Sequence, residues 1–132
     1  MSKINTKVTD SVDFFKGNKP SDLTAKFGSP LYVYSEEILR QRCRDVKNLV
    51  KYPKFSVNYS AKANSNLAFL EIVHEEGLNV DAMSPGEIFV ELKAGFKPEQ
   101  IFYISNNVTA EEMKFAIDHD VLISVDSVSQ LE

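Results

Sequence analysis

Residues 55–64 read Phe-Ser-Val-Asn-Tyr-Ser-Ala-Lys-Ala-Asn, and apolar and polar side chains alternate strictly along them. This alternation predicts a β-strand with one apolar face and one polar face. The polar row includes one long amine, Lys62, close to the start of the next predicted helix. Taken alone, the stretch favours a half-exposed antiparallel strand whose polar face meets water. The alternative is a barrel strand whose small polar residues point inward, and the rest of the chain favours that alternative.

The composition is that of an ordinary globular domain. The chain has 132 residues, of which 43% are hydrophobic and 26% are charged. A net charge of -4 and the lack of a basic run argue against a nucleic-acid partner. A single cysteine, Cys43, excludes an intrachain disulfide and favours a reducing compartment. The chain start lacks the apolar core of a signal peptide, and no apolar run approaches the ~20 residues of a membrane helix, so we expect a cytoplasmic protein with no membrane partner.

Residues 1–34 are expected to form an N-terminal arm and a short strand. The first part of this segment is polar, and residues 21–27 predict a short helix. The apolar residues 31–34 predict the strand. Ser35 then caps a longer predicted helix that ends at Pro53.

Strands and helices alternate through residues 35–132. The predicted strands cover about 55–64, 78–83, 101–104 and 121–125, and the helices between them cover about 66–76, 84–93 and 109–119. Ser84 and Thr109 each begin a capping box, with a glutamate three residues later, and residue 127 begins a further predicted helix. A repeat of roughly 20–24 residues suits βαβ units, whose right-handed crossovers make a parallel sheet.

Two parallel-sheet architectures fit this pattern, an open doubly wound sheet and a (β/α)8 barrel. Strands of an open sheet are usually apolar on both faces. The polar face of residues 55–64 therefore favours the barrel, of which residues 35–132 would supply the first βα units.

Polar residues follow the predicted strands at the edge where sites gather in parallel α/β folds. They are Lys62, Asp81, the run Ser105-Asn106-Asn107, and Asp126. A lysine at a strand end inside a barrel is desolvated, which lowers its pKa and makes it suited to Schiff-base chemistry. Alternatively, Lys62 is a solvated residue paired with Asp81. The spacing alone does not choose between these roles.

No cysteine and histidine cluster has the spacing of a metal site.

Several motifs in order resemble the pyridoxal-phosphate-dependent amino-acid decarboxylases with an alanine-racemase-like fold, and most closely the diaminopimelate decarboxylases. The motifs are Gly28–Tyr34, Tyr59–Asn64, Gly77–Glu87, Tyr103–Thr109 and Val125–Ser127. The segment Tyr59-Ser60-Ala61-Lys62-Ala63-Asn64 is similar to the family's Tyr-Ala-x-Lys-Ala-Asn. Ser60, Pro85, Ser105 and Val108 depart from the family pattern, but none of these changes removes the reactive amine.

The resemblance implies a cofactor, pyridoxal 5'-phosphate, held by the amine of Lys62. Asp81 would support that site as a catalytic and cofactor-binding residue beside Lys62. Glu87 also matches a family glutamate, although its capping role weighs at least equally. The implied reaction converts meso-diaminopimelate to lysine and CO2 in lysine biosynthesis, and the implied full-length enzyme is a homodimer.

The resemblance leaves the substrate and the catalytic activity open. The substrate could instead be ornithine, arginine or carboxynorspermidine, or the chain could be a non-catalytic cofactor-binding or regulatory barrel protein. Family enzymes are much longer, and their phosphate loop, their partner for the pyridine nitrogen and their β-domain lie beyond the matched region. We therefore expect the chain to be the N-terminal portion of a longer enzyme, with an incomplete barrel and no activity by itself.

Overall fold

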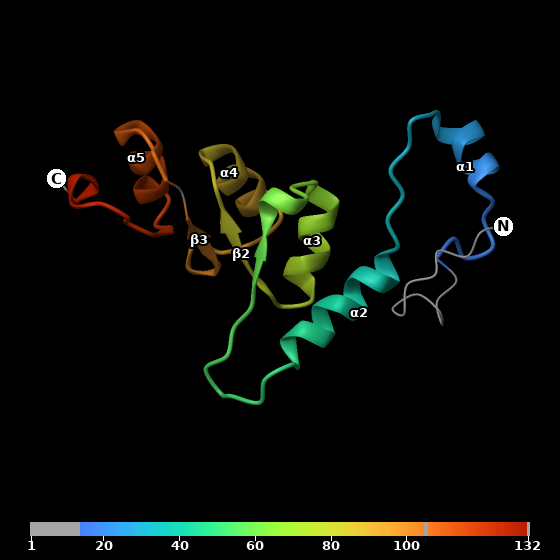
Figure 1. Ribbon diagram of the computed structural model, residues 1–132, viewed down its shortest axis with the longest axis horizontal. Helices are drawn as coiled ribbons and strands as arrows, with labels where there is room; N and C mark the ends of the chain where they lie inside the picture. The colour runs from blue at the N-terminus through green and yellow to red at the C-terminus, as the bar shows by residue number, and fades with distance from the viewer. Residues whose placement is uncertain (1–13, 105, 132) are drawn as a thin grey trace.

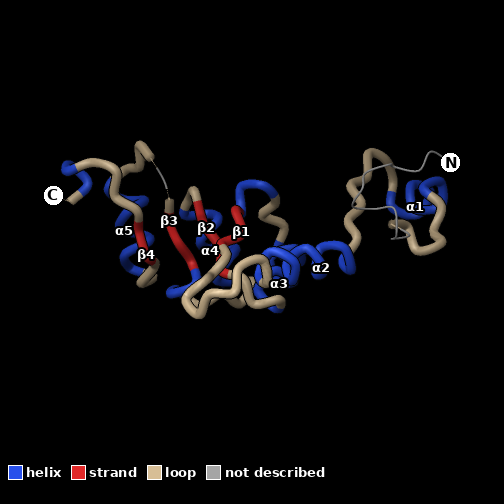
Figure 2. Tube along the Cα trace, turned by 60° about the horizontal axis from the view of Figure 1, so that its bottom comes forward, coloured by secondary structure: helices blue, strands red, loops and turns tan. Residues whose placement is uncertain are grey.

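The computed structural model of the protein describes residues 14–104 and 106–131 and contains one four-stranded parallel sheet. Its strands are β1 (Asn58–Ser60), β2 (Asn79–Ala82), β3 (Ile101–Tyr103) and β4 (Leu122–Ile123). Their spatial order follows the chain order, β1-β2-β3-β4, as Figure 2 shows. Because right-handed crossovers between consecutive neighbours place every connecting helix on the same face, this order is that of a barrel sector. A doubly wound sheet reverses its order at a switch point, so the predicted first part of a (β/α)8 barrel is confirmed.

The described residues also form five α-helices, whose arrangement around the sheet Figure 1 shows. They are α1 (Pro20–Phe27), α2 (Glu36–Lys47), α3 (Leu67–Glu75), α4 (Pro85–Lys93) and α5 (Ala110–Asp118), and three single 3-10 turns are η1 (Ala61–Ala63), η2 (Pro98–Gln100) and η3 (Val128–Gln130). α1 lies apart from the sheet and buries none of its residues. None of the described helices is long and apolar enough to cross a membrane.

The hydrophobic core lies between the sheet and the helices. Val80 and Ala82 of β2 and Ile101 and Tyr103 of β3 are at most 1% exposed. Because side chains alternate along a strand, these residues share the face that α4 covers. Leu70 and Val73 of α3 and Ile88 of α4 complete this layer and are fully buried. Each of the buried valine, leucine and isoleucine side chains stabilises the fold by roughly 1.5–3 kcal/mol relative to an exposed one.

Polar side chains cap the helices at the predicted starts. Thr109 and Glu112 form the reciprocal capping box at α5, with bonds of 3.3 and 2.8 Å. At α4, Ser84 accepts a hydrogen bond from the backbone of Glu87 at 3.2 Å. The carboxylate of Glu87, however, accepts from the backbone N–H of Met83, one residue before the N-cap. The predicted box at Ser84 is therefore only half formed, and Glu87 ties the end of β2 to the first turn of α4.

Two predicted boundaries and one predicted strand were wrong. Of the predicted strand over residues 55–64, only β1 forms a strand, because only these central residues pair with β2. The chain then turns into η1. The predicted strand at residues 31–34 is irregular. The helix after Ser35 ends at Lys47 rather than near Pro53, because the Asn48 side chain donates to the Arg44 carbonyl and closes the last turn.

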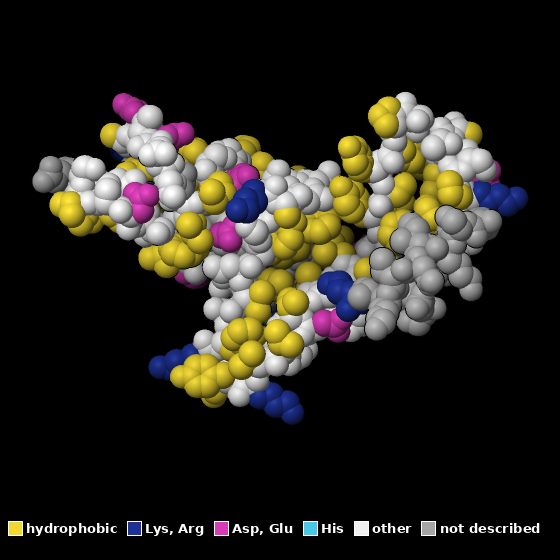
Figure 3. All heavy atoms as spheres, viewed as in Figure 1, with side chains coloured by type: hydrophobic (Ala, Val, Ile, Leu, Met, Phe, Trp, Pro, Cys, Tyr) yellow, Lys and Arg dark blue, Asp and Glu magenta, His cyan; other side chains and the backbone are white. Residues whose placement is uncertain are grey.

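The loop between α2 and β1 carries exposed hydrophobic side chains, which Figure 3 shows as a patch at the lower end of the molecule. Leu49, Val50 and Tyr52 are 76%, 47% and 62% exposed. The edge strand β4 also carries an exposed apolar residue, Leu122, which is 64% exposed. Large exposed apolar side chains gathered in this way are typical of surfaces that contact other protein.

Candidate functional site

The site is built on the face of the sheet that the helices leave open. Ser60 of β1 and Asp81 of β2 are register partners, so their side chains lie on the same side of the sheet. The hydroxyl of Ser60 donates to a carboxylate oxygen of Asp81 at 2.8 Å, and both residues are half-buried. A hydrogen bond to a charged acceptor is roughly twice as strong as a neutral one. The polar face predicted from residues 55–64 is thus real, and Ser60 holds the Asp81 carboxylate in place.

Lys62 lies two residues after Ser60, within η1. The chain turns sharply there because Ala61, packed into the core at 0% exposure, anchors the turn. The Lys62 side chain is exposed, and no residue in the described part of the chain forms a hydrogen bond or an ion pair with its amine. The burial of Lys62 that the barrel interpretation predicted is therefore not found in the described structure. The alternative ion pair with Asp81 is not found among the described residues either, where the Asp81 carboxylate accepts a hydrogen bond from Ser60.

The remaining strand-end residues lie apart from this pair. Asn106 and Asn107 are exposed, and Asn107 has a φ of 55°, in the left-handed region that asparagine tolerates better than most residues. Asp126 is also exposed, and its backbone N–H donates to the Gln130 side chain at 2.9 Å. Ser105 lies outside the described residues. Lys62 and Asp81 are thus the two strand-end residues that share the β1–β2 edge.

Sequence reasoning missed one residue, Glu91 of α4. It is 0% exposed, and neither carboxylate oxygen has a hydrogen-bond partner in the described part of the chain. Burial, followed by the charges of Glu87 and Asp81, raises the pKa of Glu91 to about 8. The sequence spacing could have indicated this burial, because Glu91 follows Ile88 by three residues and so shares the buried face of the helix.

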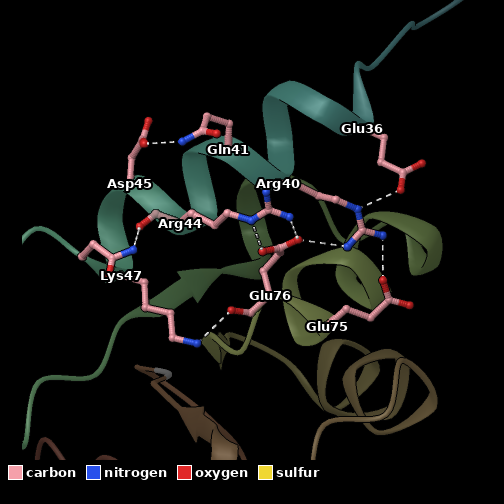
Figure 4. Close-up of polar contacts among 9 residues, drawn as sticks. Glu36, Arg40, Gln41, Arg44, Asp45, Lys47, Glu75 and Glu76 are labelled. Carbon is pink, nitrogen blue, oxygen red and sulfur yellow. Dashed lines mark hydrogen bonds and ion pairs between the residues drawn. The ribbon is translucent and has the colours of Figure 1, made fainter.

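A network of ion pairs connects α2 and α3, the helices that precede and follow β1 and η1 in the chain (Figure 4). Arg40 and Arg44 of α2 both bind the Glu76 carboxylate at the end of α3, at 3.1 and 2.8 Å. Arg40 also reaches Glu36 and Glu75, at 2.8 and 2.6 Å. The hydrogen bond from Arg44, followed by that from Arg40, lowers the pKa of Glu76 to about 2 although partial burial opposes the shift. This network is structural, and it joins the helix that precedes the Lys62 segment in the chain to the helix that follows it.

Comparison with known proteins is consistent with this geometry. The family "Pyridoxal-dependent decarboxylase, pyridoxal binding domain" matches residues 36–132. A diaminopimelate decarboxylase of Methanothermobacter thermautotrophicus is 46% identical over 112 residues, which are 83% of this chain and 26% of that protein. One from Bacillus subtilis is 37% identical over 101 residues, which are 75% of this chain and 23% of that protein.

Solved structures agree in fold. The diaminopimelate decarboxylase of Helicobacter pylori, crystallised with L-lysine, superposes with a TM-score of 0.80 at 31% identity, over 86% of this chain and 29% of that one. The chain therefore spans about a quarter of the length of these relatives. The chain belongs to the pyridoxal-dependent decarboxylases, and its described sheet and helices are an N-terminal sector of their pyridoxal-binding barrel.

Proposed function

We propose that this chain is the N-terminal part of a pyridoxal-phosphate-dependent decarboxylase that converts meso-diaminopimelate to L-lysine and CO2. The observation that carries the proposal is the exposed Lys62 amine, which follows β1 next to the Ser60–Asp81 pair. The 46% identity to a diaminopimelate decarboxylase supports the choice of substrate. In the longer protein, residues 1–34 would form an arm, residues 35–132 would form the first βα units of the barrel, and the enzyme would be a homodimer.

The residues present fit a pyridoxal group. An aldehyde-bearing cofactor needs a lysine amine that is accessible and not already engaged, and Lys62 meets both conditions within the described residues. The turn at η1 directs the chain away from the sheet after Ala61 and leaves the amine accessible at the strand end. The neutral amine is the nucleophile, and its long flexible stem lets it reach a bound group and withdraw again.

Asp81 would act as the charged neighbour of the Lys62 segment. A carboxylate close to an amine or a ring nitrogen favours the protonated form of that group. The Ser60 hydroxyl restrains the carboxylate, so its charge is preorganised rather than free to turn toward water. When bound, pyridoxal phosphate supplies an electron sink for the charge left on the substrate carbon as CO2 departs.

The test is to label the protein with pyridoxal phosphate, reduce it with borohydride and map the modified peptide. We expect the label on Lys62, and loss of specific cofactor binding in Lys62→Ala. Lys97→Ala is the matched control, because Lys97 is also exposed but lies just before β3, away from the strand ends. A label on another lysine, with Lys62→Ala still binding the cofactor as well as the unmodified protein, would overturn the assignment.

A further inference from the structure

The carboxyl group of Glu91 lies within the apolar core. α4 packs on β2 and β3 and against α3 and α5. The buried residues that these elements contribute are apolar, among them Leu70 of α3, Ala82 of β2 and Ala116 of α5. A carboxylate buried without a partner is strongly disfavoured in such surroundings, so the group is neutral when the core is intact.

The first turn of α4 lies between Glu91 and the candidate site. Glu87 lies one helical turn earlier on the same face of α4. Its carboxylate accepts from the Met83 backbone N–H at 2.6 Å. Met83 follows β2 directly, and Asp81 lies two residues before it. The first turn of α4 is therefore fastened to the end of the strand that carries Asp81.

The two charges that act on Glu91 are both negative, and one of them, Asp81, lies on the opposite, open face of the sheet. Glu87 comes from its own helix and Asp81 from β2, and each disfavours a charge on Glu91, while α3 and α5 add the apolar side chains named above. Repulsion between like charges is mutual, so a negative charge on Glu91 would repel the Asp81 carboxylate as strongly as that carboxylate repels Glu91. Burial adds to these two charges and holds the pKa of Glu91 at about 8.

We propose that Glu91, as a neutral acid in the core, is a positioning residue for Asp81 and acts on it through the first turn of α4. While Glu91 keeps its proton, the core around α4 is apolar and the Glu87–Met83 hydrogen bond holds the β2 end. When Glu91 loses its proton above about pH 8, it repels both Glu87 and Asp81 and disturbs this junction. The inference rests on the proposed function only in treating Asp81 as part of the site.

The experiment follows the carboxyl carbons of Glu91 and Asp81 and the amide of Met83 by NMR between pH 6 and pH 10. In the unmodified protein, we expect the Asp81 and Met83 signals to shift with the same midpoint as Glu91, near pH 8. In Glu91→Gln, that common shift is lost. Glu71→Gln is the control, because Glu71 is exposed on α3 and its replacement leaves the common midpoint in place.

Two results would overturn the proposal. One is a Glu91 that titrates near the ordinary glutamate value of about 4.5, and the other is a Glu91 that titrates near pH 8 while Asp81 and Met83 stay unchanged. If Glu91→Gln fails to fold, Glu91→Met tests the same loss of the common shift with an apolar side chain of similar length. Failure of the proposed function would look different, because Lys62 would then escape labelling even where these signals shift together.

Discussion

The Ser60 hydroxyl and the Asp81 carboxylate are joined across β1 and β2 by a hydrogen bond of 2.8 Å on the open face of the sheet. The bond restrains a charged group beside the Lys62 turn without burying it completely. Its position on the side opposite the hydrophobic core means that changes to it act on the site more than on the fold.

Asp81→Asn in the complete enzyme should lower kcat/KM by up to roughly 100-fold, the scale associated with small errors in positioning. The amide lacks the negative charge but keeps the size of the side chain, so the pH profile should change as well. The melting temperature should fall little, because one hydrogen bond contributes about 1 kcal/mol. Steady-state kinetics and thermal unfolding measure the two effects. An unchanged rate with a large loss of stability would show that Asp81 is structural.

Glu76→Gln should destabilise the protein at neutral pH, because it removes the charge that Arg40 and Arg44 share. The pKa of Glu76 is lowered from 4.5 to about 2, so its stabilising effect is present above about pH 4.5. That effect is lost as the pH falls toward 2, and the two proteins should then converge in stability. Urea unfolding followed by circular dichroism at pH 7 and at lower pH measures this difference. Glu75→Gln, which removes a single exposed ion pair, is the control and should change little.

Glu91→Gln and Glu91→Met should remove a fall in stability at alkaline pH. The unfolded chain releases the Glu91 proton near pH 4.5, whereas the folded chain keeps it until about pH 8. Stability should therefore decrease as the pH rises between these values, by roughly 4–5 kcal/mol at most. Urea midpoints from pH 5 to pH 9 should fall for the unmodified protein and stay flatter for both variants. A parallel fall in all three proteins would mean that another group is responsible.

Residues 1–132 expressed alone should release no CO2 from meso-diaminopimelate with added pyridoxal phosphate. The chain spans about 26% of its relative from Methanothermobacter, and positioning and preorganised charge supply most of the rate in enzyme sites. Exposed apolar residues such as Leu49 and Leu122 should also make the isolated chain associate, which size-exclusion chromatography would detect. Turnover within about tenfold of a typical 10 per second would contradict the prediction.

Local sequence patterns were sufficient to predict the element order and most helix starts. Thr109 and Glu112 bind each other's backbone within one turn, so the residues that form this cap are neighbours in the chain. The alternation at residues 55–64 likewise predicted the polar face on which Ser60 and Asp81 meet. Such features depend on dihedral preferences and periodicity, which the sequence carries directly.

Only the tertiary structure decided the length of β1, the exposure of Lys62 and the burial of Glu91. β1 is short because hydrogen bonding requires a partner strand, and β2 pairs only with Asn58–Ser60, the central residues of the stretch 55–64. Lys62 is exposed because Ala61, rather than the lysine, packs into the core at the turn. Glu91 is buried because β2 and β3 and the neighbouring helices close over one face of α4. Packing between segments distant in sequence sets each of these outcomes, and residue order alone does not contain the distances on which burial and charge interactions depend.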